Sequence, residues 1–171
     1  NVLGRRFDQP VVNLGFSGNG RLEAPLIDLI NEQDASLFVL DCMPNLHDWE
    51  IYPKTEVAER LRRSVISLRE KHPLVPILLV EHCGGTMNVS TDSSFINRYR
   101  WASDILKEGY QSLVQTGVKK LFILTAAEIG MNTESTVDGT HPTDIGMQQY
   151  ADAYEKKIRT IFNTKTNTST K

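Results

Sequence analysis

The stretch Pro76-Ile77-Leu78-Leu79-Val80-Glu81 decides the fold of this chain. It is a short apolar run without alternating polar residues, which is typical of a strand buried on both faces of a parallel sheet. The same pattern occurs in three other runs: Pro10–Phe16 (PVVNLGF), Ser36–Met43 (SLFVLDCM) and Lys120–Thr125 (KLFILT). The sequence therefore predicts a mostly parallel sheet of short, buried strands.

Helical patterns lie between these runs. Apolar residues recur at helical spacing in Leu22–Asn31, in Thr55–Lys71, in Ser93–Gln115 and in a final segment that begins near Thr143. Because strands and helices alternate, the expected class is α/β, with right-handed crossovers and helices on both faces of the sheet. Ligands bind such sheets at the carboxyl ends of the strands. The loops of interest are therefore Ser17–Gly20, Pro44–Trp49, His82–Ser90 and Ala126–Pro142.

Composition limits the function classes. The 171 residues fit one domain, expected at residues 1–162, and the polar tail Asn163–Lys171 is expected to be disordered. The formal net charge of −2 gives no reason to expect nucleic acid or an anionic membrane as partner. No apolar run approaches the ~20 residues that span a bilayer. No motif indicates a cofactor or a metal site. Cys42 and Cys83 favour two buried thiols, and a bridge between them stays open.

Asp138 and His141 form the motif that carries the most chemistry. They stand three residues apart in Thr136-Val137-Asp138-Gly139-Thr140-His141-Pro142, just before the last helical pattern. A neutral imidazole can accept a proton from a hydroxyl group, and a carboxylate on its other ring nitrogen fixes the tautomer. The alternative is a surface turn in which Asp138 caps the loop.

Two loops offer groups that could stabilise an oxyanion. Gly15-Phe16-Ser17-Gly18-Asn19-Gly20 follows the first apolar run, and its glycines allow backbone N–H groups to point at a ligand oxygen. Asn45 follows the second run and could project an amide donor into the same site. The alternatives are an ordinary strand-to-helix turn and an ordinary turn asparagine.

Together these motifs resemble the SGNH hydrolases, also called the GDSL lipase/acylhydrolase superfamily. Asn13–Gly18 is similar to the second sequence block of that family, Asp41–Asn45 to the third, and Asp138–Pro142 to the last. The resemblance implies a flavodoxin-like α/β/α fold of three layers. It also implies that Gly18 and Asn45 form the oxyanion hole and that Asp138 and His141 belong to a catalytic triad.

The first block of the family, which carries the nucleophilic serine, has no counterpart here. The only serine upstream of Gly18 is Ser17, which belongs to the second block and follows the wrong strand. The resemblance therefore implies that Asn1–Asp8 is the end of the helix that follows the nucleophile loop. We expect the first strand and the serine to lie upstream of Asn1, and the chain alone to be inactive or nearly so. Direct pairing of the flanking strands, a strand-swapped dimer or another homo-oligomer, or low stability would follow.

The resemblance implies ester hydrolysis through a Ser-His-Asp triad. A carbohydrate O-acetyl ester is the leading substrate, and a secreted or periplasmic location is favoured over a cytoplasmic one. The rival interpretation is a non-catalytic α/β binding module that kept the fold without the serine. Further side chains at strand ends and loops are candidates for substrate contact; they are Ser17, Glu81, His82 and Trp49.

Overall fold

The computed structural model describes residues 2–83 and 93–163. Most of the predicted loop His82–Ser90 and the predicted tail from residue 164 lie outside the described residues. The described chain forms two compact units. One contains residues 15–82 and 93–123, and the other contains residues 2–14, Cys83 and residues 124–163.

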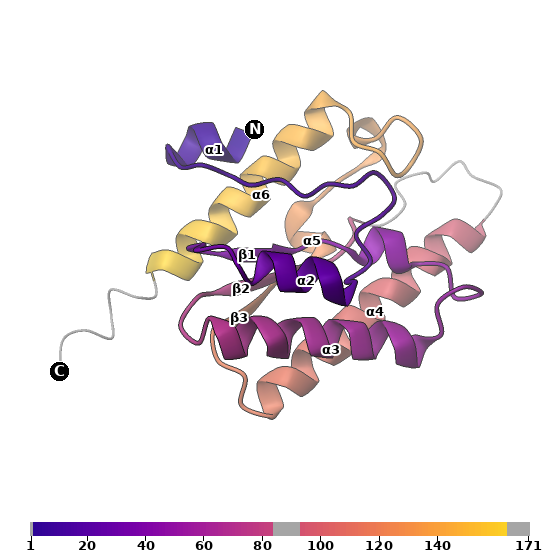
Figure 1. The fold of residues 1–171 in the computed structure, drawn as a ribbon. Helices are drawn as coiled ribbons and strands as arrows, with labels where there is room; N and C mark the ends of the chain where they lie inside the picture. Colours follow the sequence, from indigo (N-terminus) through magenta and orange to yellow (C-terminus); the bar gives the residue numbers. More distant parts are fainter. Residues whose placement is uncertain (1, 84–92, 164–171) are drawn as a thin grey trace. The chain divides into compact units, whose positions relative to one another are not determined.

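The sheet has three strands, β1 (Phe38–Leu40), β2 (Ile77–Val80) and β3 (Leu121–Leu124), in that order (Figure 1). β1 pairs with β2 in parallel, with Phe38 opposite Ile77 and Leu40 opposite Leu79. All four residues of β2 are buried. The predicted α/β class and the continuous burial of the central strand are therefore confirmed.

Three helices accompany the sheet in the unit of residues 15–82 and 93–123: α2 (Ala24–Ile30), α3 (Lys54–Lys71) and α4 (Ser93–Gln115). α3 contacts both α2 and α4. The apolar side chains that helical spacing places on one stripe of α3 are fully buried in the shared core; they are Val57, Leu61, Val65 and Leu68. Ile77 and Leu79 of β2 enter the same core. The predicted helices are confirmed, although α2 begins only after Leu22, whose φ of +56° lies outside the helical region.

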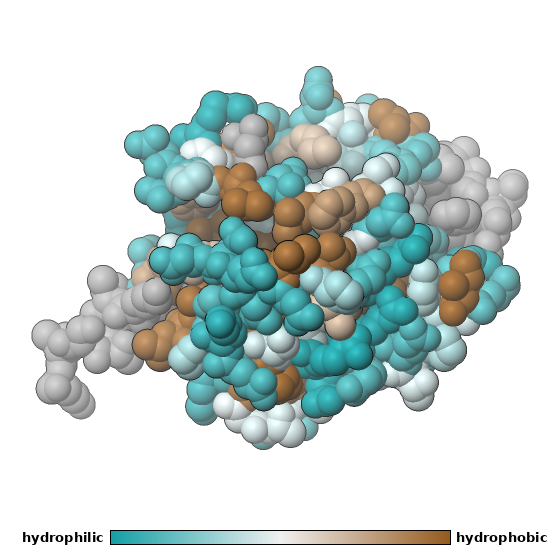
Figure 2. Space-filling model, in the orientation of Figure 1, coloured by the Kyte–Doolittle hydropathy of each residue, from teal (hydrophilic) through white to brown (hydrophobic). Residues whose placement is uncertain are grey.

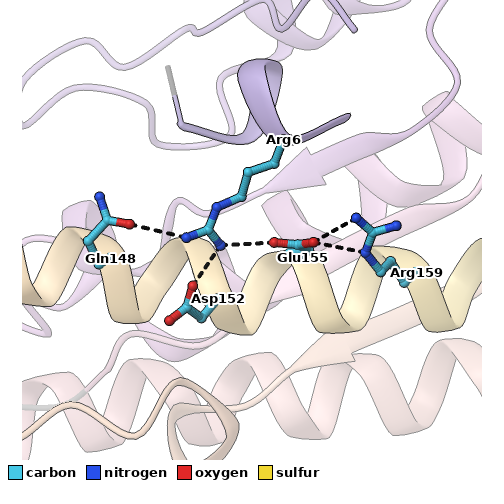
Figure 3. A network of polar contacts seen from close by, with 5 residues as sticks. All are labelled: Arg6, Gln148, Asp152, Glu155 and Arg159. Atoms are coloured by element: carbon cyan, nitrogen blue, oxygen red, sulfur yellow. Dashed lines mark hydrogen bonds and ion pairs between the residues drawn. The ribbon is translucent and has the colours of Figure 1, made fainter. Parts of the chain in front are cut away.

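The other unit contains α1 (Val2–Phe7), α5 (Ala126–Ile129) and α6 (Asp144–Asn163). No residue of α1 is buried, and α1 contacts α6. The Arg6 guanidinium lies 2.6 Å from Asp152 and 2.9 Å from Glu155, and it also donates to Gln148 (Figure 3). A helix lies within Asn1–Asp8, and its place at the end of a longer helix stays a prediction. Asn163, which was expected to open a disordered tail, is instead the last residue of α6.

The predicted strand at Pro10–Phe16 is wrong. These residues form neither helix nor strand, and all are exposed. Their apolar side chains keep large exposed fractions, from 44% for Leu14 to 70% for Val12. Figure 2 shows hydrophobic side chains along the course of this segment. A strand exists only when a neighbouring strand completes its backbone hydrogen bonds, and an apolar pattern alone does not supply one.

Two smaller points complete the fold. Cys42 and Cys83 both carry thiols, and burial raises the pKa of the Cys42 thiol to about 12. Among the helices of residues 2–83 and 93–163, none is both long and apolar enough to cross a bilayer.

Candidate active site

The loop between Thr136 and Pro142 is closed by its own backbone. Thr136 and Pro142 form an antiparallel bridge, and the Val137 amide donates to the His141 carbonyl at 2.9 Å. Gly139 turns the chain at a φ of +86°, a conformation that glycine adopts without a steric penalty. The loop therefore returns on itself and places Asp138 beside His141.

Asp138 contacts His141 through both carboxylate oxygens. Its Oδ1 accepts from the backbone amides of Thr140 at 3.0 Å and His141 at 2.8 Å. Its Oδ2 lies 2.6 Å from His141 Nδ1, so the imidazole donates through Nδ1. When the ring is neutral, this leaves Nε2 as the basic nitrogen. The His141 side chain is 75% exposed, so Nε2 is accessible to a reacting group.

These contacts hold the carboxylate in its charged form. The pKa of Asp138 falls to about 2, chiefly because the His141 amide donates to it and further because the imidazole and the Thr140 amide do. Asp138 is therefore ionised at neutral pH. A charged orienting group beside Nδ1 stabilises the imidazolium that forms when Nε2 takes a proton. The arrangement can serve as a general base and its orienter.

The start of α6 holds the ends of this loop. The Thr143 amide donates to the Ser135 carbonyl at 2.9 Å, and the Thr143 hydroxyl donates to the Glu134 carbonyl. Gly146, in the first turn of α6, lies so close that a Cβ there would be 2.0 Å from the Ser135 oxygen. The loop that carries the pair is thus held against a rigid helix.

The loop around Gly18, which was predicted to bind an oxyanion, forms a tight turn. The Asn19 amide donates to the Phe16 carbonyl at 3.1 Å, and both residues between them have positive φ, +36° at Ser17 and +73° at Gly18. This is the backbone of a type I′ turn. Both central residues are exposed, and a Cβ at Gly18 would meet no atom within 4 Å. The space beside Gly18 is open to a ligand.

Asn45 contacts the loop that follows this turn. It lies in η1 (Met43–Leu46), a short 3-10 helix, and its Nδ2 donates to the carbonyls of Asn19 at 3.4 Å and Gly20 at 3.3 Å. Gly20 has a φ of +107°. The structure thus brings Asn45 together with the loop of Gly18, and it brings Asp138 together with His141. The first pair and the second belong to different units.

Two candidates for substrate contact, Glu81 and His82, are buried directly after β2, with exposed fractions of 3% each. Glu81 forms an ion pair with Lys107 at 2.9 Å, which raises the pKa of that lysine. His82 stacks on Tyr99 with ring centroids 3.9 Å apart. Neither is a solvated loop residue, and their contact with substrate stays a prediction.

The sequence interpretation missed the partners of these groups. Tyr99, Ser103 and Lys107 recur at every fourth position of α4, so they lie along one face of that helix. The sequence shows this spacing, but it does not show that the face contacts Glu81 and His82.

Trp49, another candidate, is 39% exposed, with the Arg98 guanidinium over its ring and Trp101 at its edge. Its contact with substrate also stays a prediction.

The described residues contain no group of three or more side chains suited to hold a metal ion.

The family model described as GDSL-like lipase/acylhydrolase matches residues 1–159. The chain belongs to this family. A solved structure described as a GDSL-like lipase from Bacteroides ovatus is 30% identical, with a TM-score of 0.82, and the match covers 94% of this chain and 46% of that chain. A search of curated protein sequences found no match.

A second solved structure shares the fold. It is the salicylyl-acyltransferase SsfX3 from a tetracycline biosynthetic pathway, 18% identical, with a TM-score of 0.76. The match covers 94% of this chain and 48% of that chain. The chain therefore spans about half the length of these two solved structures. The expected α/β fold of the family is confirmed.

Proposed function

We propose that this chain carries the base, the orienter and two oxyanion donors of a serine esterase. The observation that carries the proposal is the 2.6 Å contact between Asp138 Oδ2 and His141 Nδ1, which leaves the exposed Nε2 as the base. His141 takes the proton of a serine hydroxyl as that oxygen attacks an ester carbonyl, and then returns it to the departing alcohol. Asp138 stays ionised throughout.

The nucleophilic serine is proposed to lie in sequence that precedes Asn1. Ser17 is a poor candidate, because it is the first central residue of the Phe16–Asn19 turn and its neighbour Gly18 is the proposed donor. The exposed apolar segment 10–16 supports a missing neighbour, since its side chains are of the kind that a parallel sheet buries. Without that neighbour, the segment is also suited to cover itself in a homo-oligomer or a strand-swapped dimer.

The oxyanion would be held by the Gly18 N–H and the Asn45 amide, together with the amide of the upstream serine. The open space at Gly18 supports this role. Asn45 has two N–H groups on Nδ2, and its contacts of 3.3 and 3.4 Å with adjacent carbonyls are long enough to exchange for a charged oxygen. Loss of one such donor typically lowers turnover by ~10²–10³.

The proposed substrate is an ester, with a carbohydrate O-acetyl group as the leading candidate. Support comes from Trp49, which lies on the loop after η1 and combines an exposed ring with the charged groups of Arg98 and Asp48. The names of the two matched structures, a GDSL-like lipase and an acyltransferase, both denote chemistry at an acyl group. A secreted or periplasmic location accompanies this proposal.

Two chains test the proposal: the 171-residue chain and the longer chain that the proposal requires, which extends upstream of Asn1 and is called the longer product. A fluorophosphonate probe should label a serine of the longer product and leave the 171-residue chain unlabelled, because labelling needs an activated serine. Hydrolysis of p-nitrophenyl acetate by the longer product should disappear in His141→Ala and persist in His72→Ala, a histidine far from this loop in sequence. Robust hydrolysis by the 171-residue chain that Ser17→Ala abolishes would overturn the placement of the nucleophile.

The second candidate is a non-catalytic binding module. It is favoured by one observation, that the Asn45 amide is already donated to the carbonyls of Asn19 and Gly20. In that case the longer product would neither react with the fluorophosphonate nor hydrolyse the ester, and His141→Ala would change nothing but local structure.

A further inference from the structure

Asn45 rests on a support that lies outside its own helix. η1 has four residues, and 3-10 helices of this length have poor hydrogen-bond geometry. Its core anchors are Met43 and Leu46, both buried, and residues three apart on a 3-10 helix lie on one stripe. Two anchors on one stripe fix an axis, but they leave the rotation of the turn about that axis open.

A cluster of three rings, those of His47, Tyr99 and His82, supplies a contact off this stripe. His47, which caps the C-terminus of η1, lies 4.7 Å from the Tyr99 ring, and Tyr99 is stacked at 19° on His82. His47 also donates from Nδ1 to the Pro44 carbonyl, one residue before Asn45. Contacts between η1 and α4 are extensive. The path from the end of β2 to the residue beside Asn45 is therefore continuous.

The residue types in this ring cluster indicate a positioning role. Tyr99 and His82 are almost fully buried, and a site that needs only packing is served more simply by apolar side chains. Buried polar rings fix geometry because each ring must satisfy its own partners. The hydrogen bonds of Asn45 itself are long and thus weak, so they do not orient the amide alone.

We propose that Tyr99, held by His82 and acting through His47, is a positioning residue for the Asn45 amide. Tyr99 does not touch the reacting atoms. It fixes the rotation of η1 so that Nδ2 stays directed at the loop of Asn19 and Gly20, beside the proposed oxyanion donor Gly18. The catalytic role of this positioning rests on the proposed function, whereas the effect of Tyr99 on the orientation of Asn45, called the link, does not.

The link is tested on the 171-residue chain by NMR. The side-chain amide of Asn45 is assigned as the signal that Asn45→Asp removes. Tyr99→Leu should shift this signal and raise hydrogen exchange at the Asn45 backbone amide, which donates to Cys42, by about tenfold, the rate change for roughly 1.4 kcal/mol of lost local protection. Exchange in β2 should stay slow, and Tyr99→Phe, which keeps the ring, should preserve the wild-type signal.

Tyr110→Leu is the matched control, because Tyr110 is a half-buried tyrosine on the same helix. It should leave Asn45 unchanged. Where Tyr99→Leu fails to fold, His47→Leu removes the other side of the same contact and should give the same shift. The proposal is refuted by an unchanged Asn45 signal in a folded Tyr99→Leu or His47→Leu variant. An equal effect of Tyr110→Leu would also refute it.

An activity measurement on the longer product separates this inference from the proposed function. Tyr99→Leu should lower kcat for p-nitrophenyl acetate by about tenfold, less than the loss of a whole oxyanion donor, with little change in KM. If the NMR link holds and the longer product has no esterase activity, the proposed function fails and the positioning stands. If esterase activity is present and Tyr99→Leu leaves kcat unchanged, the positioning role fails alone.

Discussion

Gly146→Ala tests how tightly the loop of Asp138 and His141 is held against α6. A Cβ at this position would lie 2.0 Å from the Ser135 carbonyl oxygen and 3.0 Å from Met131 Cε. The first is a backbone atom, so relief requires movement of the chain and not only of a flexible side chain. The Ser135 oxygen also accepts from the Thr143 amide at 2.9 Å, and these two residues flank the loop that carries Asp138 and His141.

The magnitude follows from three contributions. Overpacking of this kind costs about 1–3 kcal/mol. A strained or lost hydrogen bond between Thr143 and Ser135 adds about 1 kcal/mol. Alanine regains up to about 1 kcal/mol of helix propensity over glycine. The net loss of unfolding free energy is therefore about 1–3 kcal/mol.

The assay is urea unfolding of the 171-residue chain, followed by circular dichroism. With a slope near 2 kcal/mol per molar urea, a loss of 2 kcal/mol lowers the midpoint by about 1 M. Gly109→Ala in α4 is the control, because its Cβ would meet Leu61 Cδ2 at 2.6 Å, the movable end of a side chain, and a smaller loss is expected. A midpoint for Gly146→Ala equal to or above that of the wild type would refute the packing argument.

Three further predictions concern charged groups. The carboxyl carbon signal of Asp138 should titrate near pH 2. Since the folded pKa lies below the ordinary aspartate value of 3.8, the stabilisation is complete above that value and disappears as pH falls through about 2. Asp138→Asn should remove this part of the pH dependence of unfolding. Lys107→Met should lower unfolding free energy by about 1–3 kcal/mol in urea titrations, because it leaves Glu81 buried without this ion pair, and the double variant with Glu81→Gln should recover part of the loss. Arg6→Ala should raise hydrogen exchange in α1, and high salt should produce the same effect in the wild type, whereas the conservative Arg6→Lys should weaken α1 less.

Local sequence pattern was sufficient to predict helices that bury one apolar stripe and strands that are one continuous apolar run. β2 and α4 follow directly from PILLVE and from the helical spacing after Ser93, and α3 differs from its predicted start by one residue. The pair of Asp138 and His141 could be predicted because the two residues are only three positions apart and Gly139 between them allows the chain to turn. Even α5 had a signal that was overlooked, since Thr125 and Glu128 have the spacing of a capping box and the structure forms it.

Contacts between distant parts of the sequence could not be predicted, because local pattern does not show which elements pack together. The ring cluster of His47, Tyr99 and His82 joins three elements, and no spacing along the chain indicates how their rings meet. The burial of Glu81 likewise depends on Lys107, which lies on the opposing helix. Charged and aromatic residues at strand ends look solvated in sequence because the sequence does not show what covers them.

The segment 10–16 separates apolar pattern from strand formation. Its run PVVNLGF is as apolar as those of β1 and β3, yet it forms no strand, and its valines, leucine and phenylalanine stay about half exposed. Burial of such side chains stabilises by roughly 1.5–3 kcal/mol each, so a neighbouring strand would gain several kcal/mol by covering them. The apolar pattern therefore indicates that the segment is suited to a buried position beside a neighbouring strand. The proposed upstream strand would supply that environment and the nucleophile together, which is why the fluorophosphonate assay on the longer product bears on the fold as well as on the chemistry.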